Sequence, residues 1–303
     1  LTVELRFAPT GPTADVTMPA WCPGSYLIRD YARFVRELTA TADGVQVDAL
    51  KIDKQTWRIA CGGAREVVVR YRVYGYDLTV RTNHIDGEHA FLHGPATFLY
   101  PVAERHEPVE VAIRGPIGWH VVTAAAPAGE HYTATSIDEL FDHPFHVGKA
   151  HVIQLPSKVP ARLAIWGERV PGGPFDEARL AADLGAIVDD HVARFGEAPF
   201  AEYTFMLMLA HEAYGGLEHR ASSVNLYHPY FGASRKGYEG LLELLSHELF
   251  HAWNGKRLAP PPLLDFDYAR EAYMSCLWVM EGVTSHYDRF ALRSSSRIAA
   301  KSY

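Results

Sequence analysis

The sequence predicts an α+β protein of two domains: an N-terminal antiparallel β domain over residues 1–170 and an α+β domain over residues 171–303. Three observations support this assignment. The first half consists of short segments rich in Val, Ile, Tyr and Trp that are separated by turn residues. A proline- and glycine-rich stretch, Arg169–Pro174, then interrupts the chain. After this stretch, apolar residues recur with helical spacing.

Six strands are expected in the first domain, because their residues favour strands and often alternate between apolar and polar. They are Thr2–Ala8, Trp57–Cys61, Glu66–Tyr74, Val109–Ile113, Trp119–Thr123 and Ala161–Trp166. Turn pairs such as Asp43-Gly44 and Gly62-Gly63 separate them. Strands at this spacing are typical of a sandwich or of open antiparallel sheets.

The second domain is expected to contain three helices and two strands. In chain order these are a helix within Phe175–Phe195, strands Tyr203–Leu209 and Ser222–Tyr227, and helices Tyr238–Gly255 and Arg270–Leu292. The run Pro260-Pro261-Pro262 excludes helix directly after the second helix, because proline lacks the N–H that a helix needs. The order helix, strand, strand, helix, loop, helix indicates an α+β domain.

Composition limits the possible partners. A hydrophobic content of 48% and a charged content of 21% are those of an ordinary globular protein. The net charge of −7 argues against a nucleic acid or an anionic membrane as partner, since no positive field would hold one. No apolar run reaches the roughly 18 residues that a membrane span requires. We expect a cytoplasmic protein, or a periplasmic one if a signal peptide precedes Leu1; the oligomeric state is not indicated.

One motif carries metal chemistry: His247-Glu248-Leu249-Phe250-His251. On a helix, residues four apart lie about 40° apart in rotation and about 6 Å apart along the axis, so both imidazoles can hold one ion. Two imidazoles and a carboxylate suit a single Zn²⁺ and leave a fourth position for water. Glu248 projects beside this ion and could act as general base. Composition alone gives only about 0.05 such motifs in a chain of this length, so a chance match is uncommon.

A third ligand is expected from a second helix. Glu281 is the strongest candidate, because it is an acid in an otherwise apolar stretch and an unpaired buried carboxylate would be costly. A buried salt bridge would also explain it. Glu271, Asp265 and Asp267 are alternatives in more polar surroundings.

A second motif, Tyr214-Gly215-Gly216-Leu217-Glu218-His219, precedes the strand at Ser222–Tyr227. Gly215 and Gly216 allow close backbone approach, and a strand edge there could pair with an extended peptide. Glu218 could then bind the charged amino terminus of that peptide, and His219 either points into the cleft or caps the strand. A turn with an exposed glutamate is an equally good explanation for the motif taken alone.

These motifs resemble those of a known family. The segment Ser246–Arg257 is similar to the core of the glycyl aminopeptidases (peptidase family sixty-one), which are gluzincins that usually carry a PDZ domain. Gly216–Arg220 and Leu277–Ser285 resemble two further family motifs, and Met18–Asp30 resembles a signature of the N-terminal half. The match therefore touches both predicted domains.

The resemblance implies a thermolysin-like catalytic domain behind the β domain, as in the related aminopeptidase N family. It implies zinc on His247, His251 and Glu281, with Glu248 as general base and Glu218 as the residue that recognises the amino terminus. The implied function is a zinc aminopeptidase that removes small residues, glycine and alanine first, from peptides. The alternatives are a gluzincin endopeptidase and a non-catalytic, zinc-containing module that binds peptides.

Two features depart from the aminopeptidase N pattern. Here 29 residues separate His251 from Glu281 (281 − 251 − 1), whereas that family has a gap of about 18. The oxyanion-stabilising tyrosine of these enzymes has no counterpart after Glu281, and we expect it, with a helical region and a PDZ domain, beyond Tyr303. The run Ser294–Arg297 could also join two pieces that are not adjacent in the gene.

A group of histidines, His84, His89 and His93, lies outside these motifs. Their spacing could suit a second metal, but no carboxylate accompanies them in an evident geometry. We interpret them as part of a polar loop.

Overall fold

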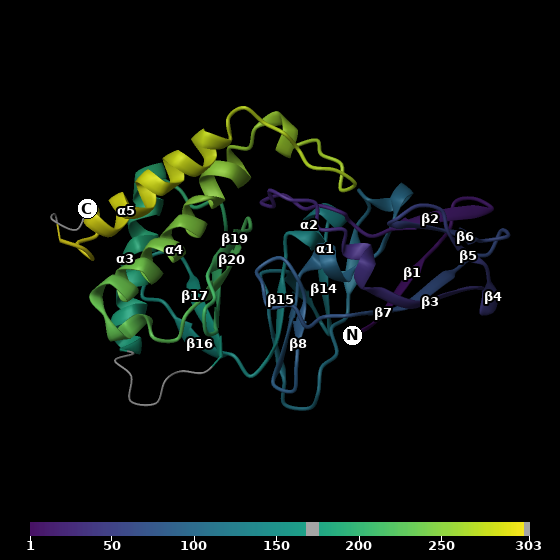
Figure 1. Cartoon of the computed structure of the whole chain (residues 1–303), viewed down its shortest axis with the longest axis horizontal. Coiled ribbons are helices and arrows are strands. Elements are labelled where there is room, and N and C mark those ends of the chain that lie inside the picture. Colours follow the sequence, from purple (N-terminus) through teal and green to yellow (C-terminus); the bar gives the residue numbers. More distant parts are fainter. Residues whose placement is uncertain (168–175, 300–303) are drawn as a thin grey trace. The chain divides into compact units, whose positions relative to one another are not determined.

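The computed structural model describes residues 1–167 and 176–299. The chain divides into two compact units, each described here by itself (Figure 1). The first comprises Leu1–Val121, Ala125–Gly148 and Phe266–Ala272, and the second comprises Val122–Ala124, Lys149–Asp265 and the chain from Tyr273 onward. The α+β class with an N-terminal antiparallel β domain is therefore confirmed.

The first unit consists of antiparallel sheets. Two four-stranded sheets have the orders β1-β7-β3-β4 and β10-β2-β6-β5, and two others the orders β11-β14-β13 and β12-β15-β9-β8. The strands are β1 (Thr2–Phe7), β2 (Thr13–Thr17), β3 (Val35–Ala42), β4 (Val45–Val47), β5 (Ala49–Lys51), β6 (Thr56–Ala60), β7 (Val67–Val73), β8 (His84–Ile85), β9 (His89–Leu92), β10 (Tyr100–Pro101), β11 (Val109–Val111), β12 (His120–Val122), β13 (Ala126–Ala128), β14 (His131–Ala134) and β15 (Phe145–Gly148). Two short helices, α1 (Gly94–Thr97) and α2 (Ile137–Phe141), and 3₁₀ turns at Tyr31–Phe34 and Val102–Glu104 complete the unit.

The core of the first two sheets follows from strand alternation. In β7, Val67, Val69, Tyr71 and Val73 are buried, while Arg70 and Arg72 between them are exposed. Residues two apart share a face of a strand, so one face of β7 is apolar and the other carries Val68, Arg70 and Arg72. The apolar face packs with residues of β2 and β6, including Val16 and Ile59, into one hydrophobic cluster. The six expected strands are all present, but the last of them, Ala161–Trp166, belongs to the second unit.

The segment Phe266–Ala272 belongs to the first unit although it is remote in sequence. Tyr268 is 2% exposed, and its carbonyl oxygen accepts hydrogen bonds from the backbone N–H groups of Ala20 (2.8 Å) and Trp21 (3.1 Å). The rings of Trp21 and Phe266 meet edge to face at 5.9 Å. The motif Met18–Asp30 therefore anchors this segment.

The expected helix Arg270–Leu292 is consequently wrong in its first part. No helix forms at 271–274, and helical structure begins only near Leu277. A π-helical turn, Val279–Val283, leads into α5 (Thr284–Ser294). The physical reason is tertiary: Phe266 and Tyr268 contribute to the aromatic core of the first unit, which prevents the chain beside them from entering a helix.

The second unit is built on one five-stranded sheet of order β16-β17-β18-β20-β19. Its strands are β16 (His151–Gln154), β17 (Ala161–Gly167), β18 (Tyr203–Leu209), β19 (Gly215–Glu218) and β20 (Ser222–Tyr227). β17, β18 and β20 run parallel, and β16 and β19 pair antiparallel at the two edges. Every residue of β18 and β20 is buried, as expected for central strands covered on both faces. The two helices that pack with this sheet are α3 (Glu177–Phe195) and α4 (Arg235–Phe250).

The expected domain boundary at residue 170 differs from the structure. The division falls between Gly148 and Lys149, because β16 and β17 belong to the sheet of the second unit. Seven residues of β17 pair in parallel register with β18, from Ala161 with Tyr203 to Gly167 with Leu209. The proline- and glycine-rich stretch Arg169–Pro174 lies outside the described residues. Within the described part of the chain, no helix is both long and apolar enough to cross a bilayer.

Candidate metal and peptide site

The histidine motif lies at the end of α4. The helix begins at Arg235, and the hydroxyl oxygen of the preceding Ser234 accepts a hydrogen bond from the backbone N–H of Gly237 (3.0 Å) and so caps the first turn. Its leucines, Leu241, Leu245 and Leu249, are fully buried and hold the helix against the sheet. After Phe250 the chain continues in a distorted π-type turn, Ala252–Arg257, that is interrupted at Asn254 and Gly255. The expected helix Tyr238–Gly255 is thus confirmed to Phe250, and it ends there instead of at Gly255.

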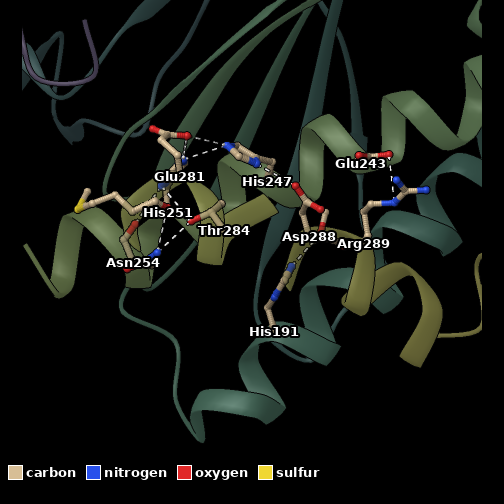
Figure 2. A network of polar contacts seen from close by, with 11 residues as sticks. His191, Glu243, His247, His251, Asn254, Glu281, Thr284, Asp288 and Arg289 are labelled. Carbon is tan, nitrogen blue, oxygen red and sulfur yellow. Dashed lines mark hydrogen bonds and ion pairs between the residues drawn. The ribbon is translucent and has the colours of Figure 1, made fainter. Parts of the chain in front are cut away.

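The structure brings His247, His251 and Glu281 together (Figure 2). The Nε2 atoms of the two histidines lie 3.1 Å apart, and Oε2 of Glu281 lies 3.4 Å from Nε2 of His247 and 3.8 Å from Nε2 of His251. Ligand atoms each about 2.0–2.2 Å from a tetrahedral zinc ion lie roughly 3.3–3.6 Å from one another. The three residues therefore fit a zinc ion. Of the four acids considered from the sequence, only Glu281 joins both histidines within the described residues.

The other nitrogen of each imidazole is fixed by a hydrogen bond. Nδ1 of His247 donates to Oδ2 of Asp288 at 2.8 Å, and Nδ1 of His251 donates to the carbonyl oxygen of Asn254 at 2.9 Å. These partners determine the tautomers, so both Nε2 atoms present their lone pairs toward Glu281. The kink at Asn254 is what turns its carbonyl back toward His251. The site therefore has the outer support typical of a metal centre.

Further contacts tie the two site helices together. The amide of Asn254 donates to the carbonyl of Met280 (3.0 Å) and to the hydroxyl of Thr284 (3.0 Å). On the far side of His247, the hydroxyl of Ser246 donates to the backbone carbonyl of Asp288 (3.0 Å). Glu281 itself lies in the π-helical turn Val279–Val283, a distortion that is frequent at functional sites.

The electrostatics of the site favour a cation. Burial alone would lower the pKa of His247, but its hydrogen bonds with Asp288 and Glu281 and the nearby charge of Glu248 raise it to about 10. Burial raises the pKa of Asp288, against the opposing pull of His247. Three carboxylates thus surround one imidazole and stabilise positive charge there. A divalent ion competes with the proton for this position.

Glu248 points toward the edge strand β19. A methyl group placed on Gly216 would lie 1.8 Å from Oε1 and 2.3 Å from Cδ of Glu248, so only glycine leaves room for this carboxylate. Residues two apart share a face of a strand. Glu218 therefore lies on the face of β19 that Gly216 presents to Glu248. Glu248 is 6% exposed, and the hydroxyl of Tyr203 donates to its backbone carbonyl at 3.2 Å.

Other residues of the second motif, Tyr214–His219, have structural roles. Gly215 opens β19, opposite Leu226 of β20. His219 is buried, and its backbone N–H donates to the carbonyl of Ser222 (2.9 Å), which closes the turn between β19 and β20. Binding roles for Gly215, Gly216, Glu218 and His219 stay predictions.

Asp288 was not anticipated from the sequence, and neither was the Asn254 carbonyl. Asp288 follows Glu281 by seven residues, which is two helical turns, so it lies on the same helix face. That spacing was the available signal, because a histidine that binds metal commonly donates its second nitrogen to a carboxylate. The role of the Asn254 carbonyl could not be predicted from the sequence, because this carbonyl is a backbone group that every residue carries.

Replacing Asp288 should weaken the metal site without dismantling it. We expect Asp288→Asn to lower zinc affinity about 10- to 100-fold, the usual cost of losing a carboxylate that orients a ligand histidine. Competition with a chromogenic chelator would measure this. The control is Glu243→Gln, which removes a negative charge one turn before His247 at a residue that pairs with Arg289 at 3.8 Å. Equal losses in both variants would contradict a specific role for the hydrogen bond.

Family models match both ends of the chain. The model of the peptidase M61 N-terminal domain matches residues 1–149, and the model of the M61 glycyl aminopeptidase matches residues 240–303. A search of curated proteins found no match.

Solved structures with similar folds include an aminopeptidase N family protein from Idiomarina loihiensis, 31% identical with a TM-score of 0.94. All of this chain is covered, but it spans only 53% of that protein. The M1 zinc metallopeptidase of Deinococcus radiodurans is 12% identical with a TM-score of 0.52 over 98% of this chain and 67% of the other. A variant of that enzyme bound to a Tyr-Ser-Ala substrate is 13% identical with a TM-score of 0.51, over 98% and 67%. These last two show a shared fold.

The expected family therefore has support from independent directions. Its N-terminal and catalytic models match the two ends of the chain in the correct order, and the catalytic match contains His247, His251 and Glu281. A protein of the wider aminopeptidase N group, 31% identical, has the same fold over the whole chain. The chain belongs to the M61 glycyl aminopeptidase family.

Proposed function

We propose that this chain is the core of a zinc aminopeptidase that removes single residues from the amino end of peptides, preferring glycine and alanine. The observation that carries the proposal is the position of Glu248. Its carboxylate lies against Gly216 of β19, while its helix neighbours His247 and His251 converge with Glu281. General base, metal ligands and a strand edge are thus supplied by adjoining elements. The preference for small residues rests on the family resemblance.

The strand β19 supports peptide binding. It is the last strand of the sheet order, and its outer edge pairs with no other strand of the described chain. Such an edge can hold an extended peptide by backbone hydrogen bonds. Gly216 lets the carboxylate of Glu248 lie directly against β19, because no Cβ atom stands between them.

The chemistry divides between the metal and the protein. A bound zinc ion would polarise the scissile carbonyl and lower the pKa of water to about 7. His247, His251 and Glu281 would hold that ion, and the hydrogen bonds that the two imidazoles donate to Asp288 and to the Asn254 carbonyl keep both rings in the ligating tautomer. Glu248 would accept the proton of the attacking water and deliver it to the departing amine. One ion satisfies this set of ligands.

Glu218 distinguishes an exopeptidase from an endopeptidase. Because it lies on the face of β19 that Glu248 approaches, its carboxylate could pair with the ammonium group of the substrate. An internal peptide bond offers no such cation. This pairing would place only the first peptide bond at the metal.

Removal of the Glu218 charge tests the exopeptidase proposal. We expect Glu218→Gln to raise KM for glycine and alanine anilides about 10- to 100-fold, the loss of one charge-assisted hydrogen bond. N-acetylated peptides should be poor substrates of both forms. The matched control is Glu212→Gln, at an exposed glutamate in the loop before β19, and it should leave KM unchanged. Equal cleavage of free and acetylated peptides by the wild-type protein would support an endopeptidase instead.

A further inference from the structure

The hairpin of β8 and β9 places three possible metal ligands on one face. His84 is paired with Phe91 and Ile85 with Ala90, and the N–H of Asp86 donates to the carbonyl of His89 at 3.0 Å. His84 and Asp86 are two apart in an extended segment, so their side chains share a face. His89 lies directly across from Asp86, and paired residues in an antiparallel ladder also share a face. The register alone therefore gathers His84, Asp86 and His89.

The distances within this cluster are those of a ligand set. Nδ1 of His89 lies 3.3 Å from Oδ1 of Asp86, and Nδ1 of His84 lies 3.9 Å from Oδ2 of the same carboxylate. One ligand atom from each residue lies within 4.8 Å of the other two. The corresponding distances among His247, His251 and Glu281 are 3.1, 3.4 and 3.8 Å. Both clusters therefore satisfy the same distance criterion for a shared ion.

The two imidazoles of this cluster are more deeply buried than its carboxylate. The side chain of His89 is inaccessible and that of His84 is 10% exposed, whereas that of Asp86 is 27% exposed. Burial lowers the pKa of His84, and it lowers the pKa of His89 to about 4 against the pull of Asp86. The partly exposed carboxylate leaves a route for an ion and for a water ligand.

The residues around the cluster hold His89 and Asp86 in defined positions. The ring of His146, on β15, stacks on His89 with centroids 5.3 Å apart, and neither of its buried ring nitrogens has a hydrogen-bond partner among the described residues. Gly148, which pairs with His89, leaves room for that residue, because a Cβ atom there would lie 2.9 Å from Cβ of His89. Asp86 is held in place by the N–H groups of Glu88 (2.8 Å) and His89 (2.9 Å), which both donate to Oδ1. An ion would approach a carboxylate that is already oriented.

We propose that His84, Asp86 and His89 form a second metal site in the N-terminal β domain, which takes a first-row divalent cation such as Zn²⁺. Two imidazoles and one carboxylate favour zinc over Ca²⁺ or Mg²⁺, which bind through oxygen ligands. The ion would tie β8 to β9 across their turn and serve structure instead of catalysis. The interpretation as a polar loop was wrong, because His84 and His89 lie in strands and Asp86 supplies the carboxylate.

Metal content tests the proposal. The purified protein is loaded with zinc and dialysed against metal-free buffer. It should then contain two zinc ions per chain, as measured by inductively coupled plasma mass spectrometry. Asp86→Asn should contain one, because an amide keeps the backbone hydrogen bonds to Oδ1 but ligates zinc poorly. Asp48→Asn, at an exposed acid between β4 and β5, should keep two. His84→Gln provides a second variant that should contain one, and circular dichroism checks that each variant is folded.

The two sites can be separated in one further step. His247→Ala should retain the ion at Asp86, and the double variant His247→Ala/Asp86→Asn should retain none. A wild-type protein with one ion, unchanged in Asp86→Asn, would overturn the second site and leave the proposed aminopeptidase site intact. Loss of the ion in His247→Ala but not in Asp86→Asn would have the same meaning.

Discussion

Glu248→Gln should abolish most of the peptidase activity while leaving zinc in place. Glutamine has the same shape as glutamate but cannot accept the proton of the attacking water. A positioned general base contributes about 10²- to 10⁴-fold to the rate, so kcat on glycine and alanine anilides should fall by that factor. KM should change little, because the side chain acts on the water and not on the substrate. Steady-state kinetics together with zinc content would measure both effects.

The matched control for this variant is Glu239→Gln. Glu239 lies on the same helix, about two turns before His247, and is paired with Arg235 in a partly exposed ion pair. It should keep wild-type kcat and zinc content. Activity of Glu248→Gln within a few-fold of the wild type would exclude Glu248 as the base. Loss of zinc from Glu248→Gln would instead indicate that Glu248 is a ligand.

The local part of the site could be predicted because it depends on helix geometry. His247, Glu248 and His251 are consecutive in one helix, and the pitch of a helix fixes their relative directions. Glu281 could be inferred from the cost of an unpaired acid in an apolar stretch. The first inference depends only on the geometry of a short helical segment. The second depends only on the energetic cost of leaving one buried acid unpaired. The structure brings His247, His251 and Glu281 together, and their roles stay predictions.

The parts that could not be predicted depend on which remote segments meet. The sequence from Arg270 has helical spacing, yet the chain beside it is held by backbone hydrogen bonds from Ala20 and Trp21 to Tyr268. β17 has the composition of the strands before it, yet it pairs with β18, which follows a whole helix later. Neither partner is specified by local propensity, so both the start of the last helix and the domain boundary were misplaced.

The contact between Gly216 and Glu248 also joins segments that are remote in sequence. It leads to the second prediction with a large expected effect. Gly216→Ala would place a methyl group 1.8 Å from Oε1 of Glu248. The backbone of β19 is fixed by its pairing with β20, so the carboxylate must move. A displacement of about 1 Å in a catalytic group costs on the order of 10²-fold in rate. We expect kcat to fall by about that factor, with zinc retained.

Stability should be much less affected than activity, and this difference distinguishes a catalytic clash from a folding defect. The atoms that must give way belong to the end of a flexible side chain, so thermal unfolding should change by only a few degrees. The control is Gly282→Ala beside Glu281, where an added methyl group meets no atom within 4 Å and helix propensity improves. It should keep kcat. If Gly216→Ala kept wild-type kcat, Glu248 would act from another position, and the assignment of β19 as the strand beside the reacting bond would lose its main support.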